Sequence, residues 1–171
     1  MIETFGLHTQ HEILRDPYLA ATEIARRYPL VDTIAIATTE IDFVTFELRL
    51  KPYTELVHDG YCTEIVRISV FRNGNILAVP IGADRRWKHR HPEPFRQLCL
   101  WYPIDPPSLK WNWSKSLVDY VAIVHRHLLG EEFWRRTGDW PGEDAPHGES
   151  VDGTHPILSL ALRLRAGVGL Q

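Results

Sequence analysis

Apolar and polar residues alternate along the first half of the chain in a way that predicts a β-sheet. From Val44 to Leu50 every even position is apolar and every odd position is polar, so this segment has one face for a core and one for solvent. Asn73-Gly74 is a strong hairpin signal between two such segments. We expect an antiparallel meander of four strands joined by loops, at residues 33–38, 42–50, 64–72 and 75–81, with residues 51–60 as one of the loops.

A helical period precedes this sheet. Asp16-Pro17 is expected to begin a helix, because Asp caps helices and Pro fits the first helical position. Apolar residues then repeat at helical spacing as far as Tyr28, and Pro29 ends the helix.

A second helix is predicted after the sheet. Ser114 is the expected cap, and Gly138 is the expected stop after Thr137. The stripe that would face the core consists of Leu117, Val121, Val124 and Leu128. Residues 138–156 are rich in Gly, Pro, Asp and His and predict a loop, whereas residues 156–167 fit a strand as well as a helix.

Composition narrows the class of protein. A chain of 171 residues with 44% hydrophobic and 24% charged residues is typical of one globular domain and argues against disorder. The net charge of −3 does not indicate binding of nucleic acid, and no apolar run is long enough to span a bilayer. The N-terminus lacks the pattern of a secretory signal. With only Cys62 and Cys99, we expect a cytoplasmic protein with two free thiols.

The chemistry of the chain is concentrated around Cys99. A thiolate is the best side-chain nucleophile near neutral pH and a natural acyl carrier, and attack on its thioester produces an oxyanion. His89 or His91 is a candidate donor to that oxyanion. The four basic residues nearby would bias Cys99 toward the thiolate; these are Arg85, Arg86, Lys88 and Arg90. The alternative is that Cys99 is a small buried hydrophobe between Leu98 and Leu100.

The order of these parts resembles the ubiquitin-conjugating enzyme fold, over roughly residues 15–137. In that family a His-Pro-Asn turn stands ten residues before the catalytic cysteine, Leu follows the cysteine, and Trp-Ser opens the next helix. Here His89 stands ten residues before Cys99, Leu100 follows it, and Trp113-Ser114 corresponds to Trp-Ser. The LCLWYP segment and the TGDWP segment at residues 137–141 are similar to the bacterial branch found in type II CBASS antiphage operons.

The resemblance implies a fold and an activity. The fold would be α/β (α+β): an N-terminal helix, a four-stranded antiparallel meander, a histidine turn and cysteine loop, and a long helix on the sheet. One domain would span residues 1–171, with a core at about 15–137 and a C-terminal extension at 138–171. Cys99 would carry a protein C-terminal carboxylate as a thioester and transfer it to an amine. The substrate would be a nucleotidyltransferase that makes cyclic oligonucleotides (a CD-NTase), joined through its C-terminus.

The chain also departs from the family. His91 stands where the family has asparagine, so the resemblance implies that His89 shapes the turn and His91 is the oxyanion donor. His91-Pro92-Glu93 also aligns as the turn, which leaves either histidine as the donor. The Tyr-Pro-x-x-Pro-Pro element is absent, and the loop from Cys99 to Trp113 is longer. No phosphate-binding loop is present, so a separate activating enzyme, or exchange with an existing acyl bond, would supply the activated carboxylate, and we expect no cofactor.

Other functions remain open for the same residues. The fold with an inert cysteine would be a binding module. His89 and His91 share a face of an extended segment and would chelate zinc in a hydrolase, with His58, His147 or Cys99 as a third ligand. The basic segment around Trp87 would bind nucleic acid. Three further expectations concern packing. His125 and His127 are expected on the helix near its C-terminal turns, and Cys62 is expected to be a structural thiol. The tryptophans at 101, 111 and 113 are expected in core and loop packing or along a peptide channel.

Overall fold

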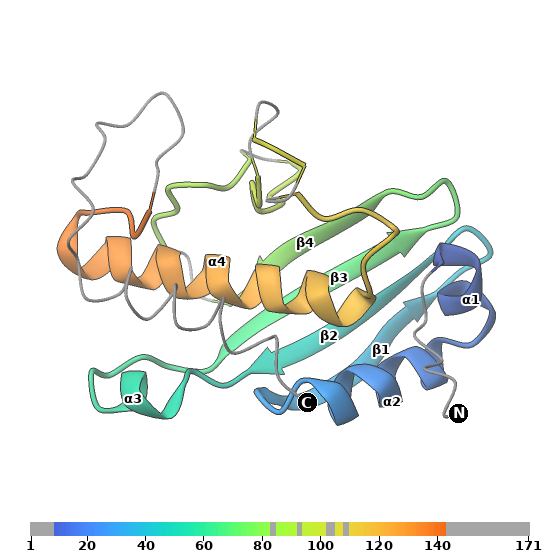
Figure 1. Ribbon diagram of the computed structural model, residues 1–171, viewed down its shortest axis with the longest axis horizontal. Helices are drawn as coiled ribbons and strands as arrows, with labels where there is room; N and C mark the ends of the chain where they lie inside the picture. Colours follow the sequence, from blue (N-terminus) through green and yellow to red (C-terminus); the bar gives the residue numbers. More distant parts are fainter. Residues whose placement is uncertain (1–8, 83–84, 92–93, 102–104, 108–109, 143–171) are drawn as a thin grey trace.

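An antiparallel four-stranded sheet forms the centre of the protein, which we describe from a computed structural model over residues 9–82, 85–91, 94–101, 105–107 and 110–142. The strands are β1 (Val31–Thr39), β2 (Phe43–Leu50), β3 (Glu64–Phe71) and β4 (Ile76–Ile81). They lie in the order β1-β2-β3-β4, so each strand pairs with its neighbour in the chain (Figure 1). The predicted meander is confirmed, with ends that differ from the prediction by a few residues.

The register places one apolar set on one face of the sheet. Phe46 pairs with Ile68, and Ile68 pairs with Ala78. Paired residues share a face, so the apolar residues of β2, β3 and β4 form one layer. The β3–β4 turn needs glycine, because Gly74 has a φ of +89°.

Within the described residues, four helices accompany the sheet. They are α1 (Gln10–Arg15), α2 (Pro17–Arg27), α3 (Thr54–Val57) and α4 (Leu117–Thr137). In Figure 1, α4 crosses in front of the sheet and α2 runs beside β1. Asp16 caps α2 as predicted, through a hydrogen bond of 2.9 Å from the Leu19 N–H to Oδ1 of Asp16. Gly138, with a φ of +85°, ends α4 as predicted.

Three details of the predicted elements are wrong. The cap of α4 is Ser116, which forms a reciprocal capping box with Asp119, and Ser114 instead donates its hydroxyl hydrogen bond to Asn112. The segment predicted as a loop contains the short helix α3. A further helix, α1, was not expected from the hydrophobic period. Residues 156–167 and His147 lie outside the described residues.

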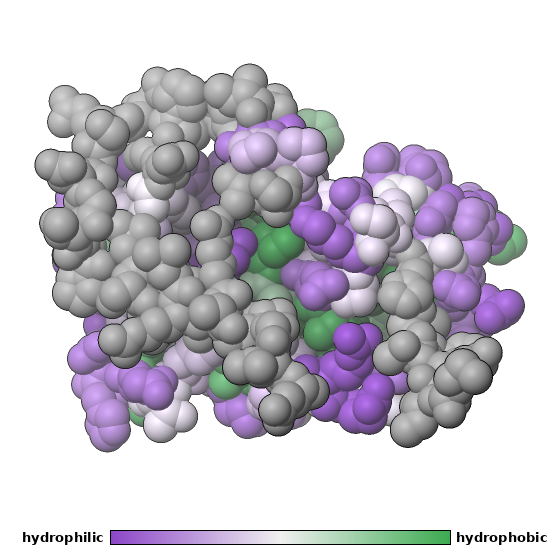
Figure 2. Space-filling view, in the orientation of Figure 1, coloured by the Kyte–Doolittle hydropathy of each residue, from purple (hydrophilic) through white to green (hydrophobic). Residues whose placement is uncertain are grey.

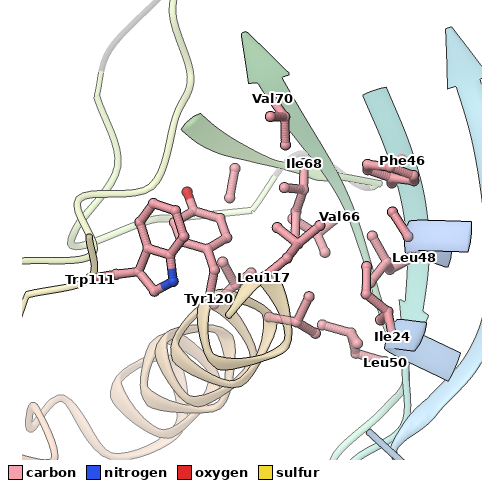
Figure 3. Close-up of a cluster of buried hydrophobic side chains, with 14 of the residues drawn as sticks. Ile24, Phe46, Leu48, Leu50, Val66, Ile68, Val70, Trp111, Leu117 and Tyr120 are labelled. Carbon is pink, nitrogen blue, oxygen red and sulfur yellow. The ribbon is translucent and has the colours of Figure 1, made fainter. Parts of the chain in front are cut away.

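The core lies between the sheet and the helices (Figure 3). Tyr120 and Leu117 of α4, with Trp111 beside them, face the residues of β2 and β3, and Ile24 of α2 closes the layer. The four residues of the predicted stripe on α4 are all buried, with at most 3% of their surface exposed. Hydrophilic residues make up much of the outer surface in Figure 2. Among the described residues, no helix has the length and apolar character that a bilayer span requires.

Candidate active site around Cys99

Cys99 lies in a short antiparallel ribbon with the histidine turn. The Cys99 N–H donates to the His89 carbonyl at 2.9 Å, and the His91 N–H donates to the Gln97 carbonyl at 2.8 Å. Arg90 and Leu98 are the bridge residues between these bonds. His89 is therefore directly opposite Cys99, where paired Cβ atoms are about 5 Å apart. The ten-residue spacing seen in the sequence corresponds to this pairing.

Leu98 attaches the cysteine segment to the sheet. Its N–H donates to the Ala78 carbonyl of β4 at 2.8 Å, and its side chain is buried in the core. Neighbouring side chains of an extended segment point to opposite sides, so Cys99 points away from the side that Leu98 fills. Cys99 is accordingly only half-buried. This geometry argues against Cys99 as a fully buried hydrophobe.

The two histidines of the turn differ in their surroundings. His89 is half-buried, and its ring packs edge-on against Trp140 with 4.4 Å between ring centroids. His91 is exposed and pairs with Gln97, two residues before Cys99. Between the two candidates, His89 is thus the histidine paired with the cysteine, whereas His91 lies one step further along the ribbon.

Glu131 of α4 holds the backbone of the turn. Its carboxylate is fully buried and accepts the N–H of Lys88 at 2.9 Å and the N–H of His89 at 2.6 Å. His127, one turn earlier on α4, places Nε2 at 3.1 Å from the His89 carbonyl. A carbonyl only accepts, so Nε2 carries the proton. The His89 carbonyl thus accepts hydrogen bonds from both His127 and Cys99.

The electrostatics at Cys99 are opposite to the sequence-based prediction. Burial raises the pKa of the Cys99 thiol, and the charge of Glu131 raises it further, so the basic neighbours do not bias Cys99 toward the thiolate. Burial alone would raise the pKa of Glu131 too. Hydrogen bonds from His127 and from the backbone of Lys88 and His89 outweigh burial, and the pKa of Glu131 lies below its ordinary value.

Two of the four basic residues, Arg85 and Arg90, instead pack against Trp87. The guanidinium carbons of three arginines lie within 5.5 Å of the Trp87 ring centroid, namely those of Arg85, Arg90 and Arg135. Arg85 also donates two hydrogen bonds to the buried carboxylate of Glu64. These contacts disfavour the interpretation of this segment as a surface for nucleic acid.

Trp140 packs against both the histidine turn and α4. It contacts the rings of His89 and His127, with centroids 4.4 and 5.5 Å apart. Gly130 makes this possible, because a Cβ there would lie 3.1 Å from Cη2 of Trp140. The TGDWP segment therefore ends α4 and returns Trp140 to the histidine turn.

Other candidate residues lie apart from this site or are buried. His125 and His127 are both buried, which corrects the expectation of a helix face near the C-terminal turns. Cys62 is exposed, and its thiol lies 3.7 Å from the Gly60 carbonyl. Trp111 is buried in the core as predicted. Over the ranges that the structure describes, no three His, Cys, Asp or Glu side chains form a metal-binding group.

The sequence reasoning missed Glu131, His127 and Trp140 as members of the site. The available signal was the spacing of His127 and Glu131, which are four residues apart and so share a helix face. A scan against models of protein families matched none of them, and a search of curated proteins found no match.

Proposed function

We propose that the protein is a cysteine-dependent conjugating enzyme in which Cys99 carries an acyl group as a thioester. The observation that carries this proposal is the pairing of His89 with Cys99, which leaves a half-exposed thiol beside a fixed histidine turn. A thiol must be reachable to accept an acyl group, and a polar group held next to it is needed when the thioester collapses to an oxyanion.

The residue roles follow from these positions. Cys99 is the acyl carrier. His89 lies opposite the thiol and shapes the turn, and His91, exposed on the same side of the ribbon, is the donor to the oxyanion of an incoming carbonyl. Transfer forms the bond from the acceptor amine to the acyl carbon and breaks the carbon–sulfur bond. The thiolate that leaves takes up the proton that the amine loses.

The resemblance to the ubiquitin-conjugating family provides the substrate class of this proposal. The acyl group is the C-terminal carboxylate of a protein, and the protein is a nucleotidyltransferase of bacterial antiphage signalling. The TGDWP segment, on which the likeness to the bacterial branch rests, contributes Trp140 to the packing of the histidine turn. An activating protein or an existing acyl bond provides the energy for thioester formation.

A trapping experiment tests this function. Wild type, Cys99→Ser and Cys62→Ser are each co-expressed with the proteins encoded beside this chain, and intact masses are read with and without a thiol reductant. We expect a thiol-labile adduct on wild type and on Cys62→Ser, and a stable ester on Cys99→Ser, because an oxygen ester resists thiols. The adduct mass then identifies the acyl donor.

A second candidate is a binding module with an inert cysteine, and the raised pKa of Cys99 favours it. A protonated thiol is a poor nucleophile. This candidate predicts no adduct on any variant, an unmodified Cys99, and unchanged partner binding by Cys99→Ser. That combination of results would replace the conjugating function.

A further inference from the structure

His127 and Glu131 form a buried pair that connects α4 to the cysteine ribbon. They are 8% and 0% exposed, and Nε2 of His127 lies 3.6 Å from Oε1 of Glu131. Each contacts the turn rather than solvent: Glu131 accepts the N–H groups of Lys88 and His89, and His127 donates to the carbonyl of His89. Both backbone groups of His89 are thus held by α4.

The His89 N–H has a particular position in the ribbon. In a regular antiparallel ladder, the residue opposite Cys99 would both accept from the Cys99 N–H and donate to the Cys99 carbonyl. His89 accepts from Cys99, but its N–H is directed to Glu131 instead. The carboxylate therefore ends the ribbon at the cysteine and fixes the orientation of the peptide to which Cys99 is bonded.

We propose that Glu131 and His127 are positioning residues that hold the histidine turn, and through it Cys99, in the geometry of the thiol site. This inference rests on the proposed function only for the role of Cys99 as acyl carrier. The positioning of the turn is a property of the free protein and does not depend on that role. A buried carboxylate is costly without hydrogen-bond donors, so docking of the turn and ionisation of Glu131 favour each other. The pair links the rigid helix directly to the residue opposite Cys99.

The same arrangement sets the charge around the thiol. The titratable groups on the packed elements are Lys88, His89 and Arg90 on the turn side, and His127 and Glu131 on α4. Burial raises the pKa of the Cys99 thiol and the Glu131 charge raises it further, so both favour the protonated thiol. Reactivity would rise when Glu131 is neutralised or when the turn moves away from it.

Alkylation of Cys99 as a function of pH tests the charge of Glu131. All variants carry Cys62→Ser, so iodoacetamide reports on one thiol. Glu131→Gln is expected to shift the alkylation profile to lower pH and to speed alkylation at pH 7 by roughly threefold or more, the size expected for loss of a nearby unit charge at a protein's effective dielectric. The control is Glu132→Gln, which also removes a carboxylate from α4 but one that pairs with Arg135 and Arg136. It is expected to leave the profile unchanged.

Hydrogen exchange of residues 85–91 tests the hold on the backbone. His127→Gln keeps an N–H donor near the His89 carbonyl, whereas His127→Leu has none, so exchange should quicken in His127→Leu and stay close to wild type in His127→Gln. Both His127 variants keep the Glu131 charge. They therefore still test the proposal if Glu131→Gln fails to fold. The proposal is overturned if Glu131→Gln alkylates like Glu132→Gln, or if both His127 variants exchange alike. Neither assay uses an acyl substrate, so its result is independent of the trapping experiment.

Discussion

His125 shows how a single residue makes the fold sensitive to acid. It is fully buried on α4, and its Nδ1 lies 2.9 Å from the Tyr28 hydroxyl while its ring stacks on Tyr53. Nε2 is buried without a hydrogen-bond partner among the described residues. Burial therefore disfavours the charged imidazole and lowers the pKa of His125 from 6.5 to about 4.

The consequence is a loss of stability between these two pH values. The unfolded chain takes up a proton at His125 near pH 6.5, whereas the folded chain takes it up only near pH 4. The contribution of neutral His125 to the free energy of unfolding is therefore complete above pH 6.5 and is lost as the pH falls toward 4. We expect the free energy of unfolding to fall by about 2 kcal/mol between pH 7 and pH 5 through this residue. His125→Asn, measured by urea unfolding at both pH values, should lower stability at pH 7 but lack this part of the slope. An unchanged slope would refute the assignment.

At the same scale, the sequence predicts the pairing of His89 and Cys99 but not the residues behind it. The ten-residue spacing and the apolar Leu98-Cys99-Leu100 triplet are local patterns. They relate residues close in sequence, so they can be interpreted without knowledge of the tertiary structure. Glu131 acts on a turn more than 40 residues away, as the separation of its hydrogen-bonded partners shows. Its role depends on how α4 is rotated against that turn, which no local pattern contains. The predicted thiolate failed for a similar reason, since burial and the charge of the distant Glu131 raise the pKa of Cys99.

Among the elements, the start of α4 gives a direct test of the corrected cap. Ser116 accepts the Asp119 N–H and its own N–H donates to Asp119, whereas Ser114 forms its hydrogen bonds within the described residues to Asn112. Ser116→Ala should cost about 1 kcal/mol of unfolding free energy. Ser114→Ala, the matched control, should cost clearly less. Equal costs in urea unfolding would contradict the assignment of Ser116 as the cap.

Elements with strong local patterns were predictable, and those without them were not. The strands follow from alternation at Val44–Leu50 and from the Asn73-Gly74 turn, and α2 follows from Asp16-Pro17. The helix α1 carries a capping box, Thr9 with Glu12, that is present in the sequence but covers only six residues. The cap of α4 was misplaced because Ser114 and Ser116 are two residues apart, and only the bond to Asp119 separates them.

On the scale of the whole molecule, Glu64 joins three parts of the chain. It lies at the start of β3 with 4% of its side chain exposed, and it pairs with Arg85 before the histidine turn and with Arg135 of α4 at 3.7 Å. This contact fixes the loop between β4 and α4 against the sheet. Arg85, one of the basic residues that would attract nucleic acid, is therefore used in an internal ion pair.

Removal of the Glu64 charge should destabilise the protein. Glu64→Gln removes the carboxylate to which Arg85 donates two hydrogen bonds and leaves Glu132 as the remaining carboxylate partner of Arg135, and we expect a loss of about 3 kcal/mol in unfolding free energy. The control is Glu47→Gln, whose partner Arg67 is 49% exposed, and it should cost less than about 1 kcal/mol. Thermal or urea unfolding of both variants decides the matter, and similar small losses in both would count against a joining role for Glu64.

The meander also has a consequence for the kinetics of folding. Each strand pairs with its chain neighbour, so the sheet forms through contacts of short sequence separation, which favour rapid folding. The cysteine site is different, because Lys88 and Glu131 meet across 43 residues and close a large loop. The transition state should therefore contain the hairpins while the thiol site is still open. Substitutions in β2 and β3 should slow refolding, whereas Glu131→Gln should mainly speed unfolding, in stopped-flow experiments.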